Sequence, residues 1–187
     1  ASLIIKKEKE SLNREFTMKI LLDKSTKAYR DAVLNQLIDG DNYDKLANDI
    51  PIIFPREIEY AAITVFNIFC DTSEKTSRLK EIRRYIENEL SSYIKGYCFF
   101  DKDNRLVLLN TIDNEYNIDE NVKFIQYTIK AAKGYSIPAG IGRIYKDLRN
   151  IYKSYSEACI ALEYRFTSVD KNIIYFTDCK YSNAGYV

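Results

Sequence analysis

The sequence of 187 residues contains no histidine, and its four cysteines lie far apart. Without histidine, the chain lacks the commonest general base and cannot form a Ser-His or Cys-His nucleophile pair. Cys70, Cys98, Cys159 and Cys179 form no Cys-x-x-Cys pair, so the clustered ligands of a zinc site are missing as well. We therefore expect no metal site, and we expect buried, reduced thiols, which favour the cytosol.

A strong excess of one charge and long apolar runs are also missing. Lys+Arg number 28 and Asp+Glu 27, for a net charge of +1, whereas nucleic-acid-binding faces concentrate basic charge. The longest apolar runs are much shorter than the roughly 20 residues of a membrane-spanning helix, and no signal-peptide pattern opens the chain. We expect neither DNA binding nor membrane insertion. The chain begins without Met, and we expect it to be a piece of a longer protein.

The first feature that the sequence contains is a charged helical arm over residues 1–50. Residues 3–23 predict a helix with one apolar stripe, formed by Ile5, Leu12, Phe16 and Ile20. The spacing matches a heptad seam over about two heptads, and we expect this seam to join two parallel copies in a homodimer. An amphipathic helix that packs on its own domain is an equally good interpretation.

The arm is predicted to continue as separate short helices. A second helix is expected over 25–39, with Ser25 or Thr26 as its N-cap and Gly40 as its stop. A short helix follows in "NYDKLANDI". Pro51 and Pro55 then mark the boundary to a second unit over 57–178.

The second unit alternates strand and helix patterns. Strands are predicted at 57–69, 96–111 (a hairpin around 101–104), 135–142 and 171–178, and helices at 72–94, 118–132 and 146–165. The first strand is apolar on both faces, which indicates a central position. The order β-α-β-β-α-β opens like a ferredoxin-like split βαβ arrangement. We expect an α+β fold with a mixed, mostly antiparallel sheet and helices on one face.

Gly140-Ile141-Gly142 precedes the last predicted helix and raises the question of a nucleotide site. A dinucleotide fingerprint needs a third glycine, and a phosphate loop needs a Gly-Lys-Ser/Thr end; both are missing. We interpret Gly140 and Gly142 as positions where the strand end bends and approaches a neighbour closely. On the helix that follows, we expect Ser154 and Tyr155 to hydrogen-bond to the sheet. Its tyrosines are expected to pack in the core, although a face rich in tyrosine could also stack a ring-shaped ligand.

The same stretch, "AGIGRIYKDLRNIYKSYSEACIALEYRF", resembles a known family. It is similar to the end of the degenerate GGDEF-like middle domain of AraC-type (YesN-type) response regulators, and to the GGDEF-like domain of PucR/CdaR-type regulators. The positions that carry the resemblance are Gly140, Ile141, Gly142, Leu148, Ser154, Tyr155, Glu157, Ala158, Ala161, Leu162, Tyr164 and Arg165. The resemblance implies that the arm joins a phosphorylatable receiver domain to this domain, and that an AraC-type DNA-binding domain follows.

Active GGDEF cyclases differ from this chain at two places. Their central hairpin carries Gly-Gly-Asp/Glu-Glu-Phe, where this chain has Asp101-Lys102-Asp103-Asn104. Their first strand also supplies an Asp for Mg²⁺, but residues 65–69 contain no carboxylate. We expect no cyclase activity, no catalytic residue, no metal and no cofactor. Asp101 and Asp103 are expected to form the turn instead of binding a cation.

These inferences favour a non-catalytic signalling and dimerisation module of a cytoplasmic transcriptional regulator of the two-component type. Its expected partners are a second copy, through the arm, and the receiver and DNA-binding domains of the same longer chain. The alternative is a sensor of a small molecule or nucleotide on the same fold, with its ligand between the sheet and the arm.

Overall fold

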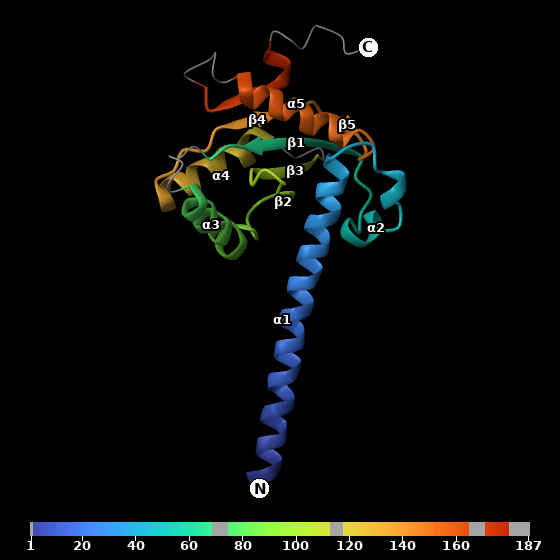
Figure 1. The fold of residues 1–187 in the computed structure, drawn as a ribbon, viewed down its shortest axis with the longest axis vertical. Coiled ribbons are helices and arrows are strands. Elements are labelled where there is room, and N and C mark those ends of the chain that lie inside the picture. The colour runs from blue at the N-terminus through green and yellow to red at the C-terminus, as the bar shows by residue number, and fades with distance from the viewer. Residues whose placement is uncertain (1, 69–74, 113–117, 165–170, 180–187) are drawn as a thin grey trace.

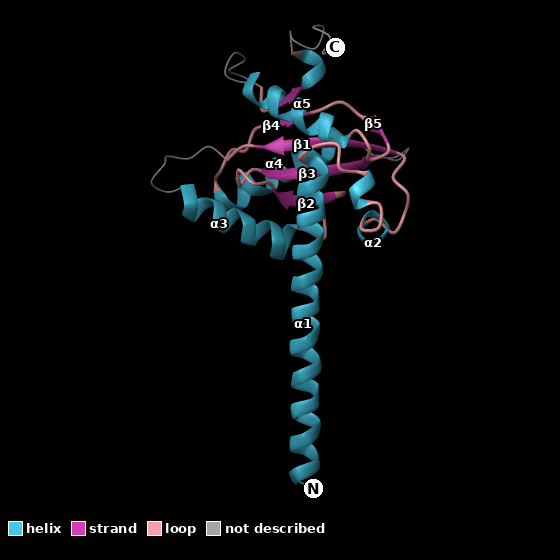
Figure 2. Ribbon diagram, turned by 45° about the vertical axis from the view of Figure 1, so that its right-hand side comes forward, coloured by secondary structure: helices cyan, strands magenta, loops and turns pink. Residues whose placement is uncertain are grey.

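The computed structural model describes residues 2–68, 75–112, 118–164 and 171–179. A long helix leads into a compact domain of mixed helices and strands (Figures 1 and 2). The helices are α1 (Ser2–Ile38), α2 (Ile50–Ile53), α3 (Lys75–Tyr85), α4 (Ile118–Lys133) and α5 (Ile151–Tyr164). The strands are β1 (Tyr60–Phe66), β2 (Tyr97–Phe100), β3 (Leu106–Ile112), β4 (Ala139–Ile141), β5 (Tyr145–Lys146) and β6 (Ile173–Tyr175). Single turns of other helix types cover Asp44–Leu46, Ile86–Leu90 and Phe176–Asp178.

The arm is one uninterrupted helix of 37 residues, so the prediction of two helices divided near Ser25 and Thr26 was wrong. Residues 2–38 contain neither Gly nor Pro, and a single Ser-Thr pair lowers helix propensity too little to end a helix. The helix does end just before Gly40, as predicted. Its first part projects away from the domain, and its last turns enter the domain (Figure 1).

The strands form one mixed sheet in the order β2-β3-β1-β4-β6, and β5 also pairs with β1. Every pairing is antiparallel except the parallel pair of β4 and β6. The predicted α+β class, the β2–β3 hairpin and the central place of β1 are confirmed. β1 is central because both of its faces are apolar, and six of its seven residues are buried.

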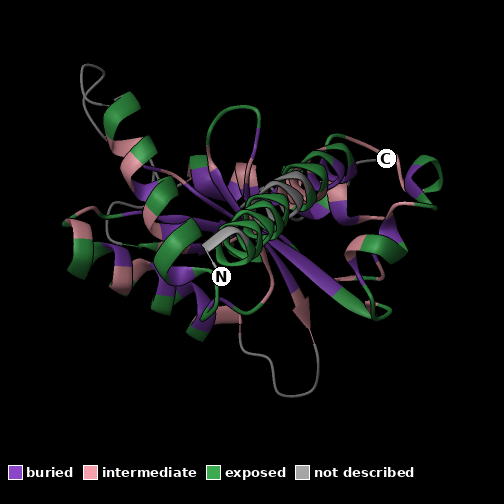
Figure 3. Ribbon diagram, turned by 90° about the horizontal axis from the view of Figure 1, so that it is seen from below, coloured by how far each residue is buried: buried purple, intermediate pink, exposed green. Residues whose placement is uncertain are grey.

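Helices cover both faces of the sheet, and the prediction that they lie on one face was wrong. α3 and α4 pack on the face that includes Phe66, Leu106 and Leu108. The last turns of α1, together with α5, pack on the face that includes Ile63 and Val107. Figure 3 shows the strands behind the arm, drawn largely as buried. A strand with two apolar faces needs cover on both sides, and the arm and α5 supply the second cover.

Two predicted boundaries shift around the Gly-x-Gly segment. β4 covers only Ala139–Ile141, and α5 begins at Ile151 instead of residue 146. The intervening β5 pairs with the start of β1, and Asp147 then adopts a positive φ of 54° while its carboxylate accepts the backbone N–H of Arg149. Because of this turn, α5 begins later in the sequence than predicted. The predicted caps of α3 at 71–73, with Phe69 and Cys70, lie outside the described residues.

Candidate functional site at the hairpin, the last helix and the arm

Asp101 lies at the end of β2, where it organises the hairpin turn. Its Oδ1 accepts the backbone N–H groups of Asp103 and Arg105, both at 2.9 Å. Its Oδ2 accepts Arg105 Nε at 2.8 Å and the hydroxyl of Tyr155 at 2.9 Å. Asn104 completes the turn with a φ of 59°. The turn-forming role expected for Asp101 is confirmed, and both oxygens of this buried carboxylate are occupied by donors of the chain itself.

Tyr155 joins α5 to this hairpin. Its hydroxyl donates to Asp101 and accepts Arg105 Nη2 at 2.7 Å. Burial raises the pKa of Tyr155, and the neighbouring Cys159 and the hydrogen bond to Asp101 raise it further. The hydroxyl therefore keeps its proton, and remains a donor to Asp101, across the physiological range.

Ser154 joins the same helix to the centre of the sheet. Its buried Oγ accepts the backbone N–H of Ile63 at 2.9 Å and donates to the carbonyl of Arg143 at 2.8 Å. The hydrogen bonds predicted for Ser154 and Tyr155 are thus present. They fasten α5 to β1 and to the hairpin at two consecutive residues.

The two glycines of the Gly-x-Gly segment lie directly under α5. A Cβ atom on Gly140 would stand 2.2 Å from the carbonyl oxygen of Ala158, and one on Gly142 would stand 2.0 Å from that of Ser154. The close approach inferred from the sequence is confirmed. Ala158 and Leu162 are buried on the same side of α5, so these motif residues form the contact between helix and strand.

Glu157 has a role that the sequence analysis missed. Its buried carboxylate accepts the backbone N–H and the Nε of Arg143, both at 2.9 Å, and the hydroxyl of Tyr145 at 2.7 Å. Burial and the hydrogen bond to Glu157 raise the pKa of Tyr145 to about 12. A glutamate on the inward face of a helix, one turn after the motif serine, was the available signal, because buried carboxylates need partners.

The remaining motif residues lie at the end of α5. Tyr164 is half-buried and packs against a small cluster that contains Ala161, Ile174 and Phe176. Arg165 lies outside the described residues. Another buried polar group went unpredicted: the side-chain amide of Asn110 donates to the carbonyl of Ala62 and to Thr64 Oγ1 inside the sheet.

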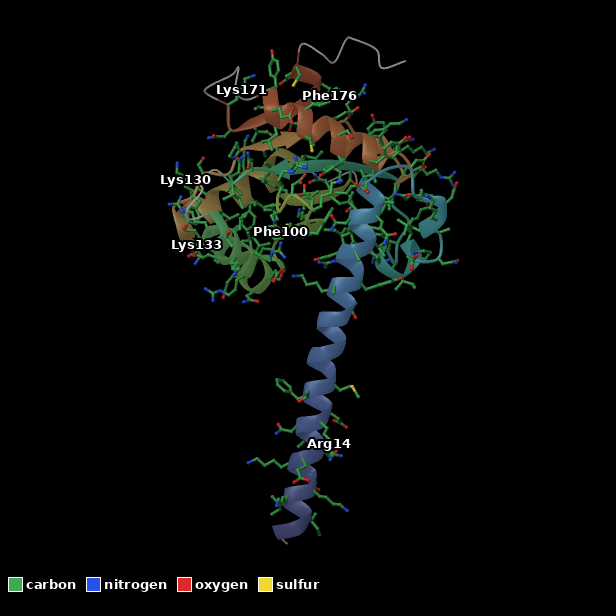
Figure 4. The ribbon with its side chains drawn as sticks, viewed as in Figure 1. Arg14, Phe100, Lys130, Lys133, Lys171 and Phe176 are labelled. Atoms are coloured by element: carbon green, nitrogen blue, oxygen red, sulfur yellow. The ribbon has the colours of Figure 1, made fainter. Side chains whose placement is uncertain are left out.

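The apolar stripe of the arm is exposed. The exposed fractions are 63% for Ile5, 67% for Leu12 and 65% for Phe16. The interpretation that the stripe packs on its own domain is therefore wrong for these three residues. The side chain of Ile20 lies outside the described part of the structure. Figure 4 places Arg14 far out on the arm, well away from the domain.

The base of the arm, by contrast, contacts the edge strand β2. Asn35 Nδ2 donates to the carbonyl of Phe100 at 3.0 Å, and Arg30 Nη2 approaches the carbonyl of Cys98 at 3.5 Å. Lys102, at the hairpin tip, forms an ion pair with Asp39 at 2.9 Å. Figure 4 shows Phe100 beside this end of α1.

A cavity of about 320 Å³ lies where the arm, the hairpin and α5 meet. Its walls include Asn35 and Gln36 from α1, Asp39 just after this helix, Phe100 and Lys102 from the hairpin, and Tyr155 from α5. This is the place where a ligand between the arm and the sheet would bind.

The end of β1 contains the residues that the sequence analysis compared with the metal-binding strand of active cyclases. Val65 and Phe66 are buried, and the backbone N–H of Asn67 donates to the carbonyl of Pro138 at 3.0 Å. Within the described residues, no three His, Cys, Asp or Glu side chains are grouped so that they could hold a metal ion. In the same part of the chain, no helix combines the length and apolar character needed to cross a membrane.

A comparison with known protein families gives a match. The family described as GGDEF-like domain matches residues 57–164. Comparison with curated proteins and with solved structures gives no match. The matched segment runs from just before β1 to the last residue of α5 and includes the hairpin, the Gly-x-Gly segment and the helix motif. Because it spans more than half of the 187 residues, the chain belongs to the GGDEF-like domain family.

Proposed function

We propose that this chain is a non-catalytic signal-relay and dimerisation module of a transcriptional regulator. In this proposal, a change in how two arms pair is passed along α1 to the GGDEF-like domain. The family match supports a signalling role in general. The resemblance of the segment from Gly140 to Arg165 to YesN-type and PucR/CdaR-type regulators supports the narrower assignment.

The observation that carries the proposal is the contrast between the two ends of one continuous helix. At its free end, Ile5, Leu12 and Phe16 are more than half exposed. At its base, Leu34 and Leu37 are almost fully buried in the same core as the sheet. Because α1 is uninterrupted between these ends, rotation or bending imposed on the free end acts on the domain core.

A relay without catalysis is supported by the chemistry of the hairpin. The turn carries no pair of glycines to admit a nucleotide, and Lys102 stands within it. The carboxylate of Asp101 accepts hydrogen bonds from Arg105 and Tyr155, whereas two-metal phosphoryl transfer needs carboxylates that are free to bind metal. In the longer chain that we propose, a cytoplasmic receiver domain precedes the arm and an AraC-type DNA-binding domain follows. The fragment itself would not bind DNA.

The dimerisation part is tested by light scattering on the wild-type chain and on the double variant Leu12→Asp, Phe16→Asp. We expect a dimer for the wild type and a folded monomer for the variant, since two carboxylates in the seam would have to be desolvated. A matched control is Ser11→Asp, Met18→Asp, which adds the same charge on a different, exposed face of the arm. A wild-type chain that stays monomeric well above micromolar concentration would contradict dimerisation through the arm.

The cavity at the arm, the hairpin and α5 favours a second candidate, a small-molecule sensor. A thermal-shift screen tests it, because a ligand that binds only the folded form raises the melting temperature. Gln36 lines this cavity and its side chain is exposed, so a stabilising compound should lose its effect in Gln36→Ala. A compound that stabilises this variant equally well binds elsewhere.

A further inference from the structure

We propose that the β2–β3 hairpin is the element that transmits movement of the arm to α5. This inference rests on the proposed function and specifies its internal route. The alternative route is the direct apolar contact between α1 and α5 in the shared core. The two routes depend on different atoms, so substitution can separate them.

The arm holds the hairpin along its open side. Among the strands that the structure describes, β2 is the last at one end of the sheet, so none of them pairs with the backbone groups on its outer side. Asn35 and Arg30 reach two of its carbonyl groups, those of Phe100 and Cys98. Asp39 then pairs with Lys102 at the tip. Two side chains of the last turns of α1, and Asp39 directly after the helix, therefore lie along β2 from its middle to the turn.

The hairpin in turn holds α5 through polar contacts at the other side of the turn. Arg105, directly before β3, donates to both Asp101 and Tyr155. Tyr155 also donates to Asp101, and this carboxylate fixes the turn through the N–H groups of Asp103 and Arg105. The turn cannot shift relative to α5 without breaking hydrogen bonds of a buried charged group, which are costly to lose.

The connection is continuous from one helix to the other. Phe100, which accepts the bond from Asn35, immediately precedes Asp101, which accepts the bond from Tyr155. A displacement of α1 that pulls on the Phe100 carbonyl is therefore applied one residue away from the carboxylate that holds α5. The direct contact between α1 and α5 consists of apolar side chains, which can slide with much less directional restraint.

Hydrogen exchange measured by mass spectrometry on the full chain tests this route. Asn35→Ala should raise exchange of the peptides that cover 97–106 and 151–164 by roughly fivefold, the effect of losing about one hydrogen bond. In a Tyr155→Phe background, Asn35→Ala should still affect the hairpin but no longer affect α5. Asp39→Asn removes the charge of the ion pair with Lys102, and it should have a similar but smaller effect.

Matched controls are present in the chain. Asn42 Nδ2 donates at 2.9 Å to the carbonyl of Gln36 on α1 itself, so Asn42→Ala removes a similar bond without touching the hairpin. Tyr152→Phe removes a hydroxyl from a neighbouring tyrosine of α5. Neither control should change how α5 responds to Asn35→Ala.

Two results would overturn the route. In the first, α5 responds to Asn35→Ala equally with and without the Tyr155 hydroxyl, which assigns the coupling to the apolar contact of α1 with α5. In the second, α5 does not respond at all. If the chain is a dimer, either result contradicts this route but not the proposed function. A monomeric wild-type chain, by contrast, contradicts the dimerisation part of the proposed function but not this route.

Discussion

Glu157 on α5 holds Arg143, fourteen residues earlier in the chain, by accepting both its backbone N–H and its guanidinium. Arg143 directly follows the Gly-x-Gly segment, so this contact fixes the path of the chain as it leaves β4. Tyr145 donates to the same carboxylate. The motif glutamate is therefore a structural anchor for the segment between β4 and α5.

Glu157→Gln should destabilise the protein by about 2 kcal/mol in urea unfolding. The amide keeps the shape of the side chain but loses the charge that accepts donors from Arg143 and Tyr145, and hydrogen bonds to charged groups contribute about 1.5–3 kcal/mol. Glu163→Gln is the control, because Glu163 is exposed on the same helix. Equal midpoints for the two variants would refute the anchoring role.

Gly142→Ala should cost at least about 3 kcal/mol, because the new Cβ would stand 2.0 Å from the backbone oxygen of Ser154 and backbone atoms yield little. Gly134→Ala separates this clash from a purely conformational effect. Gly134 has a φ of +73°, and a Cβ atom added there would meet nothing within 4 Å, so its replacement should cost only about 1 kcal/mol. Thermal or urea unfolding of both variants gives the comparison; a milder effect at Gly142 than at Gly134 would contradict the close packing of α5 on β4.

Stability should fall as the pH rises from about 9 to about 12, in part because of Cys98. Burial raises the pKa of this thiol from 9.0 to about 12. Over that range the unfolded chain releases the thiol proton and the folded chain retains it. The free energy of unfolding therefore decreases as the pH rises. Near pH 10, Cys98→Ala should make the decrease of the unfolding free energy with pH less steep by up to about 1.4 kcal/mol per pH unit.

The measurement for Cys98 is the urea midpoint at several pH values, with the slope compared between the wild type and the variant. Tyrosines with raised pKa, such as Tyr145, contribute to both slopes equally. Cys98 is half-buried on the edge strand β2, and identical slopes would show that water reaches its thiol in the folded chain.

With GTP and Mg²⁺, the purified chain should form no cyclic dinucleotide. The reason is that the turn residues which would have to admit a nucleotide and bind metal instead hold the hairpin to α5. Chromatography against a blank without protein is sufficient as the measurement. Product above the blank that disappears in Asp103→Ala would contradict the non-catalytic proposal.

Much of the domain could be predicted because its apolar patterns are local. β1 and α4 are bounded by clear changes in periodicity. Gly140 and Gly142 predicted a close approach to a neighbour, and Ser154 predicted a hydrogen bond from the last helix to the sheet. The hydrogen-bond partners of Ser154 lie 91 and 11 residues away. No spacing rule identifies such partners, which is why the pairs Glu157–Arg143 and Asp101–Tyr155 were not predicted.

The errors also have physical causes. Ser25 and Thr26 are good caps only where a helix begins, and the surrounding sequence allows the helix to continue through them. The prediction of helices on one face was made from the first six elements of the β-α-β-β-α-β order. It did not consider that the arm and α5 cover the other face of the sheet. The predicted start of α5 is too early because the pairing of Tyr145 with Ala61 depends on a strand 84 residues away.

The burial of the arm's base has a consequence for how the gene can be cut and recombined. Val33, Leu37, Leu46, Ile50 and Phe54 belong to the same apolar core as β1, although they precede the segment that matches the family. A truncation at residue 57 would remove part of this interior, and we expect it to prevent folding of the domain. Exchange of arms between proteins with related GGDEF-like domains should therefore preserve the fold only when the junction lies before Lys27, which forms an ion pair with Glu87.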